Sequence, residues 1–434
     1  MNASPPPAPP TGFGRDTQST MYRDGASGHR PSVPTGAQAL FDAAHAVMSP
    51  EAWAYVAGSS GSESTTEANR AALDRWRILP RVLRNVAVRE LGIDLFGHRY
   101  PSPVIAAPIG ALGLVRRDAD LAVARATSKL GIPYVFSNQA SSSMEDTAAV
   151  MGDGPRWFQL YWSSSDDLVT SLLRRAEASG AQAIVITLDT HTLGWRPRDL
   201  DLAYLPFIHG IGIAQYTSDP VFRELVRERL ARPASGPRPK VTPSAIRTLL
   251  DMTRKHPGKF LPNLRSGEPR AAVETFLDVF SRPSLTWEEL DFARERTSLP
   301  IVLKGIQHPD DARRAIAAGV DGIIVSNHGG RQIDGAVGSA DALPAIVEAI
   351  NGAIPVLFDS GIRGGSDIFT ALALGATAVL VGRPYVCGLA LAGERGVSEV
   401  FRNLIAEFDI VLGLSGHTSP KELSIDDLIR APLP

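Results

Sequence analysis

A histidine and an arginine three residues apart form the most chemically suggestive motif of this chain. His328 and Arg331 lie in the segment 326–332, directly after the apolar run 322–325, and the glycines between them keep the segment compact. Histidine titrates near neutral pH, whereas arginine is a permanent cation that can bind a carboxylate through two parallel hydrogen bonds. Such a pair can take a proton from a substrate while it holds the carboxylate of that substrate.

Eight short apolar runs alternate with amphipathic stretches from about residue 100 onward, which is typical of βα units and a parallel sheet. The predicted strands are 104–108, 134–137, 157–161, 183–189, 301–304, 322–326, 355–359 and 378–382. The predicted helices are 118–130, 166–179, 310–318, 343–350 and 366–374, and several of them begin with an Asp or Ser suited to an N-cap. Eight strands in this alternation predict an α/β fold, a TIM (β/α)8 barrel, rather than an open sheet.

Polar residues stand at or just beyond the C-terminal ends of these predicted strands. They are Tyr161, Asp189, Lys304, His328, Asp359 and Arg383. In a TIM barrel these strand ends meet on one face, where the βα loops build the active site. We therefore expect side chains that are far apart in the sequence to surround one pocket.

Glycine and arginine occur together after the last two predicted strands. Gly361 and Arg363 follow the seventh strand, and Gly382 and Arg383 follow the eighth. In TIM barrels these two loops often bind a phosphate on backbone N–H groups and a helix N-terminus. The sequence therefore predicts a phosphate site; the alternative is tight turns whose arginines form structural ion pairs.

One βα unit is interrupted by a long insertion after the fourth strand, at about residues 200–285. Short helices are predicted within it near 244–255 and 271–280. Because the insertion leaves the C-terminal end of a strand, it could cover the site as a lid that excludes water. A solvated excursion or an oligomer contact is the alternative.

The composition is that of a globular protein without a strong overall electrostatic field. The 434 residues carry a formal net charge of −2, which predicts no nucleic-acid partner, and no apolar run approaches the length needed to span a membrane. The single cysteine, Cys387, excludes an intrachain disulfide, and with no recognisable signal peptide we expect a cytoplasmic protein. Residues 1–36 are rich in Pro, Gly, Ser and Thr and are predicted to be a disordered tail, so that residues 37–434 form the catalytic domain. No metal site is predicted.

Several motifs of the chain resemble those of a known family. Segment 326–332 resembles the active-site signature of the FMN-dependent 2-hydroxy-acid oxidases and dehydrogenases, and further segments match in the right order: 55–58, 107–110, 158–161, 187–190, 303–306, 359–363 and 382–384. The resemblance covers the chain from about residue 36 to the end. Within the family, segments 194–200, 216–222 and 305–314 are most similar to lactate 2-monooxygenase, and the long insertion fits that subgroup.

The resemblance implies FMN as the cofactor, a small L-2-hydroxy acid and O2 as the substrates, and a homo-oligomer of four or more subunits. It implies that His328 is the base and that Asp189 orients it. Arg331, with Tyr55 and Arg196, is the implied clamp on the substrate carboxylate. Tyr161 is implied to hydrogen-bond the substrate oxygen, and Lys304 to place a cation beside the flavin ring. The implied cofactor contacts are Ala107, Pro108, Ile109, Gly110, Ser137, Gln159, Thr187, Lys304 and Ser326, then Asp359 at the ribityl chain, and Gly361, Arg363, Gly382 and Arg383 at the phosphate.

The expected reaction is the oxidation of L-lactate by O2 to acetate, carbon dioxide and water. If pyruvate leaves first, the products are those of an oxidase, or of a dehydrogenase when another acceptor takes the electrons. A small residue at Gly110 and the insertion are the features expected to influence this outcome. A phosphate-binding barrel enzyme without flavin would explain the Gly-Arg loops but not the other site residues. A non-catalytic flavin-binding sensor would lack one or more of the catalytic residues, whereas every expected residue is present.

Overall fold

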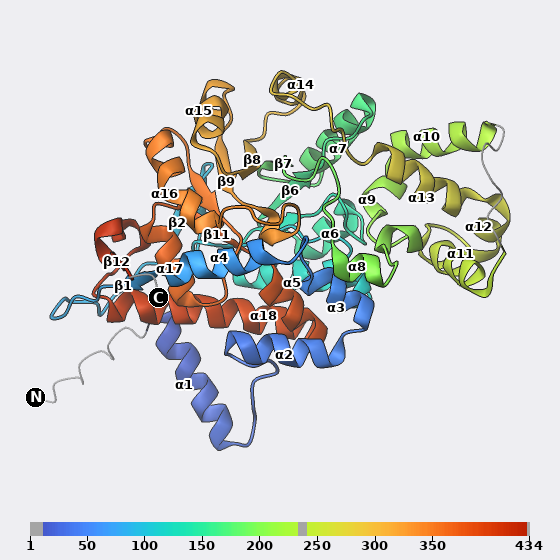
Figure 1. The fold of residues 1–434 in the computed structure, drawn as a ribbon. Coiled ribbons are helices and arrows are strands. Elements are labelled where there is room, and N and C mark those ends of the chain that lie inside the picture. The colour runs from blue at the N-terminus through green and yellow to red at the C-terminus, as the bar shows by residue number, and fades with distance from the viewer. Residues whose placement is uncertain (1–11, 233–240, 432–434) are drawn as a thin grey trace, which may run out of the picture.

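The computed structural model describes residues 12–232 and 241–431 of the chain. Eight parallel strands form a closed barrel in the order β10-β11-β4-β5-β6-β7-β8-β9, with helices around it (Figure 1). The strands are β4 (Val104–Ala106), β5 (Tyr134–Phe136), β6 (Arg156–Leu160), β7 (Ile184–Thr187), β8 (Ile301–Ile306), β9 (Gly322–Val325), β10 (Val356–Phe358) and β11 (Ala378–Val381). All eight predicted strands are present, which confirms the predicted TIM barrel.

The helices that follow the strands cover the outside of the barrel. The five predicted helices correspond to α5 (Ala119–Leu130), α7 (Asp166–Ala178), α15 (Pro309–Ala317), α16 (Ser339–Ile350) and α17 (Gly365–Ala373). The prediction missed α6 (Met144–Met151), α14 (Glu289–Arg294) and the long final helix α18 (Arg383–Leu414). Helix α6 is short, and its clearest local signal is Ser143, whose side chain accepts the N–H of Asp146 as an N-cap.

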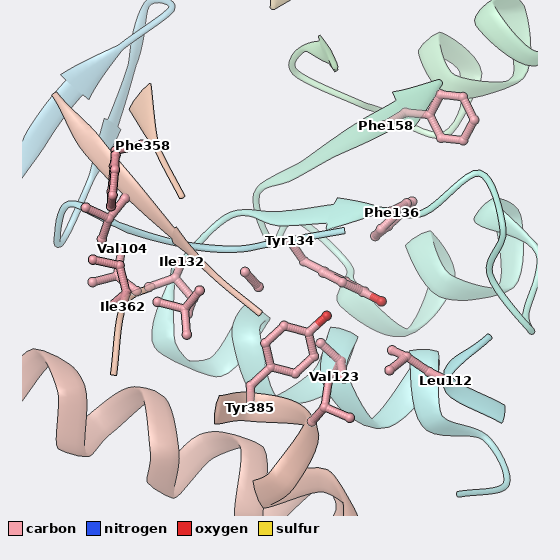
Figure 2. Close-up of a cluster of buried hydrophobic side chains, with 14 of the residues drawn as sticks. Val104, Leu112, Val123, Ile132, Tyr134, Phe136, Phe158, Phe358, Ile362 and Tyr385 are labelled. Atoms are coloured by element: carbon pink, nitrogen blue, oxygen red, sulfur yellow. The ribbon is translucent and has the colours of Figure 1, made fainter. Parts of the chain in front are cut away.

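Apolar side chains fill both the barrel and the layer between the barrel and its helices. Figure 2 shows part of the outer layer, where Tyr134 and Phe136 of β5 meet Val123 of α5 and Tyr385 of α18. The hairpin formed by β2 (Ile93–Leu95) and β3 (His98–Tyr100) closes the N-terminal end of the barrel, where the rings of Phe96 and Trp157 lie 5.5 Å apart. The opposite end of the barrel is therefore left for the site.

The segment before the barrel is more ordered than its composition predicts. It contains α1 (Phe13–Ala26), α2 (Ala37–Val47), α3 (Pro50–Ala57) and α4 (Ser64–Asp74), followed by β1 (Trp76–Ile78), which pairs with β12 (Leu428–Arg430). The disordered tail predicted for residues 1–36 is therefore wrong for residues 12–36, while residues 1–11 lie outside the described residues. Helix α1 packs on α18, and the N–H of Gly14 donates to Asp409 at 2.8 Å (Figure 1). These tertiary contacts supply the burial that composition alone does not reveal.

The insertion extends to one side of the barrel, where Figure 1 shows α10 to α13. Its elements are α8 (Pro197–Asp201), η2 (Pro206–His209), α9 (Ala214–Thr217), α10 (Pro220–Ala231), α11 (Pro243–Lys255), α12 (Phe260–Ser266) and α13 (Glu268–Val279). Helices α11 and α13 match the two that were predicted, and residues 233–240 lie outside the described part.

Two contacts attach the insertion to the barrel and its helices. Arg175 of α7 forms an ion pair with the fully buried Asp219 at 2.9 Å, just before α10. The hydroxyl of Ser163 donates to the carbonyl of Val279, at the end of α13, at 2.6 Å. The remaining short elements are η1 (Leu112–Leu114), η3 (His328–Gly330), η4 (Pro420–Glu422) and η5 (Ile425–Asp427). No described helix combines the length and apolar character needed to cross a membrane.

Candidate active site

A cavity of about 240 Å³ lies at the C-terminal ends of the barrel strands. Most of the predicted site residues line it: Tyr55, Ala107, Pro108, Ile109, Gly110, Gln159, Tyr161, Thr187, Arg196, Lys304, His328, Arg331, Asp359, Gly361, Arg363, Gly382 and Arg383. Asp189, Ser137 and Ser326 do not line it; each lies behind a lining side chain and hydrogen-bonds to it. The barrel thus brings the predicted set together around one space.

His328 is held with one ring nitrogen toward the protein. Its Nδ1 lies 2.7 Å from Oδ1 of Asp189 and 3.1 Å from the hydroxyl of Thr190. No hydrogen bond joins Nε2 to the described residues, and His328 lines the cavity. His328 has a φ of 57°, a left-handed conformation uncommon for a residue with a side chain, and its N–H donates to Ser326 at 3.0 Å. Since Nδ1 contacts Asp189, Nε2 is the ring nitrogen left to meet a ligand in the cavity.

The electrostatics of this pair suit a base. Burial lowers the pKa of His328, and the Asp189 carboxylate offsets part of that effect. Burial alone would raise the pKa of Asp189, but the positive charges of His328 and Lys304 hold it well below its ordinary value. At neutral pH the pair is therefore a neutral imidazole beside an ionised carboxylate, ready to accept a proton and to stabilise the resulting imidazolium.

Two arginines next to this pair carry positive charge without a carboxylate partner in the described residues. Arg331 donates to the backbone carbonyls of Tyr55 and Gly58, the latter at 2.8 Å. Arg196 donates to the carbonyl of Arg331 at 3.1 Å and to the side chain of Gln332 at 2.8 Å. Burial and the nearby Arg331 lower the pKa of Arg196 to about 10. Arg196 is buried and Arg331 is half-buried, and cations shielded from water without an anion are costly, so this end of the cavity favours an anionic ligand such as a carboxylate.

Tyr161 adds a neutral hydroxyl to the same cavity. Burial and the charge of Asp189 raise its pKa far above the ordinary value, so the phenol stays protonated. It can therefore donate a hydrogen bond to a substrate oxygen.

Lys304 provides a fixed cation deeper in the site. Its Nζ lies 3.2 Å from Oδ2 of Asp359 and 2.7 Å from the hydroxyl of Ser326. Burial lowers the pKa of Lys304, but Asp359 and Asp189 together outweigh this, so the net shift is upward and the amine stays charged.

Buried polar atoms near Lys304 lack partners within the protein. Gln159 accepts the N–H of Asn138 at 3.0 Å through Oε1, yet its Nε2 has no hydrogen-bond partner among the described residues, and neither has Oγ1 of Thr187. Buried polar atoms are nearly always paired. A bound group with both donors and acceptors along one edge, such as the pyrimidine edge of a flavin, would satisfy both atoms.

The predicted phosphate end contains a second pair of arginines, both half-buried. Arg383 donates to the carbonyl of Gly329 at 2.9 Å and to the hydroxyl of Ser59 at 3.0 Å. Arg363 donates to the carbonyl of Ile362 at 2.9 Å. Burial and the neighbouring Arg363 lower the pKa of Arg383. Within the described ranges neither arginine pairs with a carboxylate, so the alternative of structural ion pairs is wrong and a bound phosphate fits.

Comparison with known proteins agrees with this geometry. The family model of FMN-dependent dehydrogenases matches residues 44–430. The chain is 43% identical over 427 residues to the FMN-dependent alpha-hydroxy acid dehydrogenase qulF of Penicillium citrinum, covering 98% of each protein. The chain belongs to the family of FMN-dependent 2-hydroxy-acid dehydrogenases and oxidases.

Two further proteins of this family are similar to the chain. The chain is 39% identical over 376 residues to the L-lactate oxidase of Lysinibacillus sphaericus, covering 87% of this chain and 88% of that protein. The crystal structure of a mandelate oxidase matches with a TM-score of 0.74 at 36% identity, covering 92% of this chain and 98% of that one. The resemblance to the family that the motifs carried is thus confirmed, and FMN is the cofactor.

Several lining residues were not anticipated from the sequence. Leu205, Phe207, Leu277 and Phe280 come from the insertion or its end and line the same cavity as His328, so the insertion is a wall of the site. Gln139 and Thr190 add polar groups to the lining. Thr190 had one visible signal, because it directly follows Asp189 in a matched segment. The insertion residues had none, because no local pattern says which apolar side chains of an excursion turn back to the barrel.

Proposed function

We propose that this protein oxidises L-lactate with O2 and retains the pyruvate until hydrogen peroxide converts it to acetate, carbon dioxide and water. The observation that carries the proposal is the apolar wall formed by Leu205, Phe207, Leu277 and Phe280 around the cavity that contains His328 and Arg331. The insertion that supplies this wall is attached to the barrel side through Asp219 and Val279.

Oxidation of a 2-hydroxy acid removes two electrons and a proton from the α-carbon and a second proton from the hydroxyl group. FMN, when bound, would supply the acceptor for the two electrons, with O2 as the final oxidant that is reduced to hydrogen peroxide. Nε2 of His328 takes up a proton from the substrate, and Asp189 stabilises the imidazolium from 2.7 Å. Arg331 and Arg196 hold the carboxylate, which fixes the reacting carbon relative to His328.

The second half of the reaction requires that pyruvate stay in the cavity. It requires no further catalytic group. Pyruvate and hydrogen peroxide combine to give acetate, carbon dioxide and water, and every atom of the two reactants appears in these products. The anionic pyruvate is held by the same arginines that held lactate, while the wall limits its escape. The lifetime of pyruvate in the cavity therefore decides the product.

A second outcome is favoured by the 39% identity to an L-lactate oxidase. If pyruvate leaves before it meets peroxide, the products are pyruvate and hydrogen peroxide. The same first half-reaction serves both outcomes, since it depends on the same base, the same clamp and the same cofactor.

The test is product analysis of the purified holoenzyme with L-lactate in air. We expect one acetate and one carbon dioxide per lactate, measured by NMR and gas analysis, with little free peroxide. Equal amounts of pyruvate and peroxide would instead assign an oxidase. If none of L-lactate, glycolate and L-mandelate bleaches the flavin without oxygen, the oxidation itself is refuted.

A further inference from the structure

The turn 107–113 after β4 faces the cavity with its backbone. Ala107, Pro108, Ile109 and Gly110 line the cavity. Among the described residues, no acceptor is hydrogen-bonded to the N–H of Ile109 or of Gly110, whereas the N–H of Ala107 donates to Val381 at 2.9 Å. The turn therefore presents free backbone donors where the bound cofactor must lie.

The start of the turn is held from behind by Tyr385. This residue is fully buried near the N-terminus of α18, and its hydroxyl donates to the carbonyl of Ala107 at 2.8 Å. Its ring stacks on Phe401 with centroids 5.6 Å apart, which fixes the direction of the hydroxyl. Tyr385 is not among the residues that line the cavity, so its effect on the cofactor must pass through Ala107.

Two consecutive hydrogen bonds, both partly buried, hold the end of the turn. The N–H of Gly113 donates to the hydroxyl of Ser141 at 3.0 Å, and the N–H of Ser141 donates to Oδ2 of Asp120 at 3.0 Å. Asp120 is 1% exposed, and apart from the N–H of Ser141 its carboxylate faces the hydroxyl of Tyr134. A carboxylate in the core is costly even beside such donors, so its retention here points to a role in fixing Ser141.

The turn also packs closely on the loop after β5, so a side chain at either of its two glycines would have to displace a neighbour. A Cβ at Gly113 would lie 2.7 Å from the hydroxyl of Ser141, and a Cβ at Gly110 would lie 3.0 Å from Cβ of Gln139. Ala111, between them, has a φ of 54°, a left-handed conformation that alanine rarely adopts. Such a backbone persists only where its surroundings determine it. Figure 2 shows the rings of Tyr134 and Tyr385 with their hydroxyl oxygens turned into the same space behind this turn.

We propose that Tyr385 and Asp120 are positioning residues for the cofactor-facing turn. Tyr385 acts through the carbonyl of Ala107, and Asp120 acts through Ser141 on the N–H of Gly113. Neither residue touches the substrate. The proposal rests on the FMN site and is independent of which 2-hydroxy acid is oxidised.

The experiment compares Tyr385→Phe and Ser141→Ala with Tyr100→Phe in the holoenzyme. Tyr100 is the matched control, because it is also buried and its hydroxyl donates to Gln182 at 2.9 Å, at the other end of the barrel. Each variant removes one hydroxyl that takes part in one or more buried hydrogen bonds. Free FMN is measured by fluorescence after equilibrium dialysis, and the flavin absorption spectrum and reduction potential are recorded without substrate.

We expect Tyr385→Phe and Ser141→Ala each to weaken FMN binding about five- to tenfold, as the loss of one hydrogen bond implies, and to shift the flavin spectrum and potential. In turnover, kcat falls while KM for the hydroxy acid is unchanged. Tyr100→Phe leaves all of these quantities at the wild-type values. Equal changes in Tyr385→Phe and Tyr100→Phe, or an unchanged FMN affinity and potential in both site variants, would overturn the proposal. Because the binding, spectral and potential measurements need no product, they stand apart from the choice between acetate and pyruvate.

Discussion

Replacing Asp120 by asparagine is expected to stabilise the protein against unfolding at neutral pH. Burial raises the pKa of Asp120 from its ordinary value of 3.8 to about 6. Since one pKa unit corresponds to about 1.4 kcal/mol, this difference amounts to roughly 3 kcal/mol of unfolding free energy. The asparagine side chain would keep an oxygen that can accept the N–H of Ser141, and it cannot ionise.

The sign follows from which state binds the proton more tightly. The folded state protonates Asp120 more readily than the unfolded state does, so the favourable contribution is complete below pH 3.8 and is lost as the pH rises through about 6. Above pH 6 the folded protein carries a buried carboxylate that the unfolded chain would hydrate. The advantage of Asp120→Asn should therefore grow between about pH 4 and 6 and then stay constant.

The assay is urea unfolding of both proteins from pH 4.5 to 8, followed by circular dichroism at a fixed excess of FMN. The matched control is Asp409→Asn. Asp409 is also 1% exposed, but Arg89 pairs with it at 2.6 Å, so the loss of its charge leaves the half-buried Arg89 without its anion and should destabilise the protein at every pH tested. A difference between Asp120→Asn and wild type that is independent of pH, or one that shrinks as the pH rises from 4.5 to 6, would refute the reasoning.

Three further perturbations address the catalytic groups. Asp189→Asn should lower kcat about a hundredfold or more. It should also move the acidic limb of the kcat/KM profile to lower pH, because Asp189 raises the pKa of His328. A pH–rate series checks both effects. Gly110→Ala places a Cβ 3.0 Å from Cβ of Gln139, so the displaced Gln139 side chain should change the acetate-to-pyruvate ratio about fivefold, toward pyruvate. An unchanged ratio in product analysis counts against a role for this contact. Gln139→Gly in the same background removes the Cβ that the new methyl group meets, and it should restore the wild-type ratio. Arg363→Met should weaken FMN binding about tenfold or more while riboflavin binding stays the same, as measured by fluorescence titration, because this guanidinium belongs to the predicted phosphate end of the cavity, and riboflavin has no phosphate; equal losses for both flavins would place Arg363 elsewhere.

The sequence by itself determined the barrel and the identity of most residues around the cavity. Each barrel strand is a short apolar run, and the apolar period along a chain is a local property. The polar residues at the strand ends, such as Lys304 and Asp359, needed only the rule that parallel strands present these ends on one face. His328 and Arg331 were recognisable because both lie in one short segment.

Only the tertiary structure decided how these residues are supported and enclosed. Helix α1 is stable through its contact with α18, where Gly14 meets Asp409, which lies 395 positions later in the chain. The hydroxyl of Tyr385 reaches Ala107, and apolar residues of the insertion return to the cavity as its wall. Burial and pairing between distant segments arise only when the chain closes, since the free energy of such a contact depends on what the partner segment places there. Local patterns therefore named the chemical groups, and long-range packing set their positions and charge states.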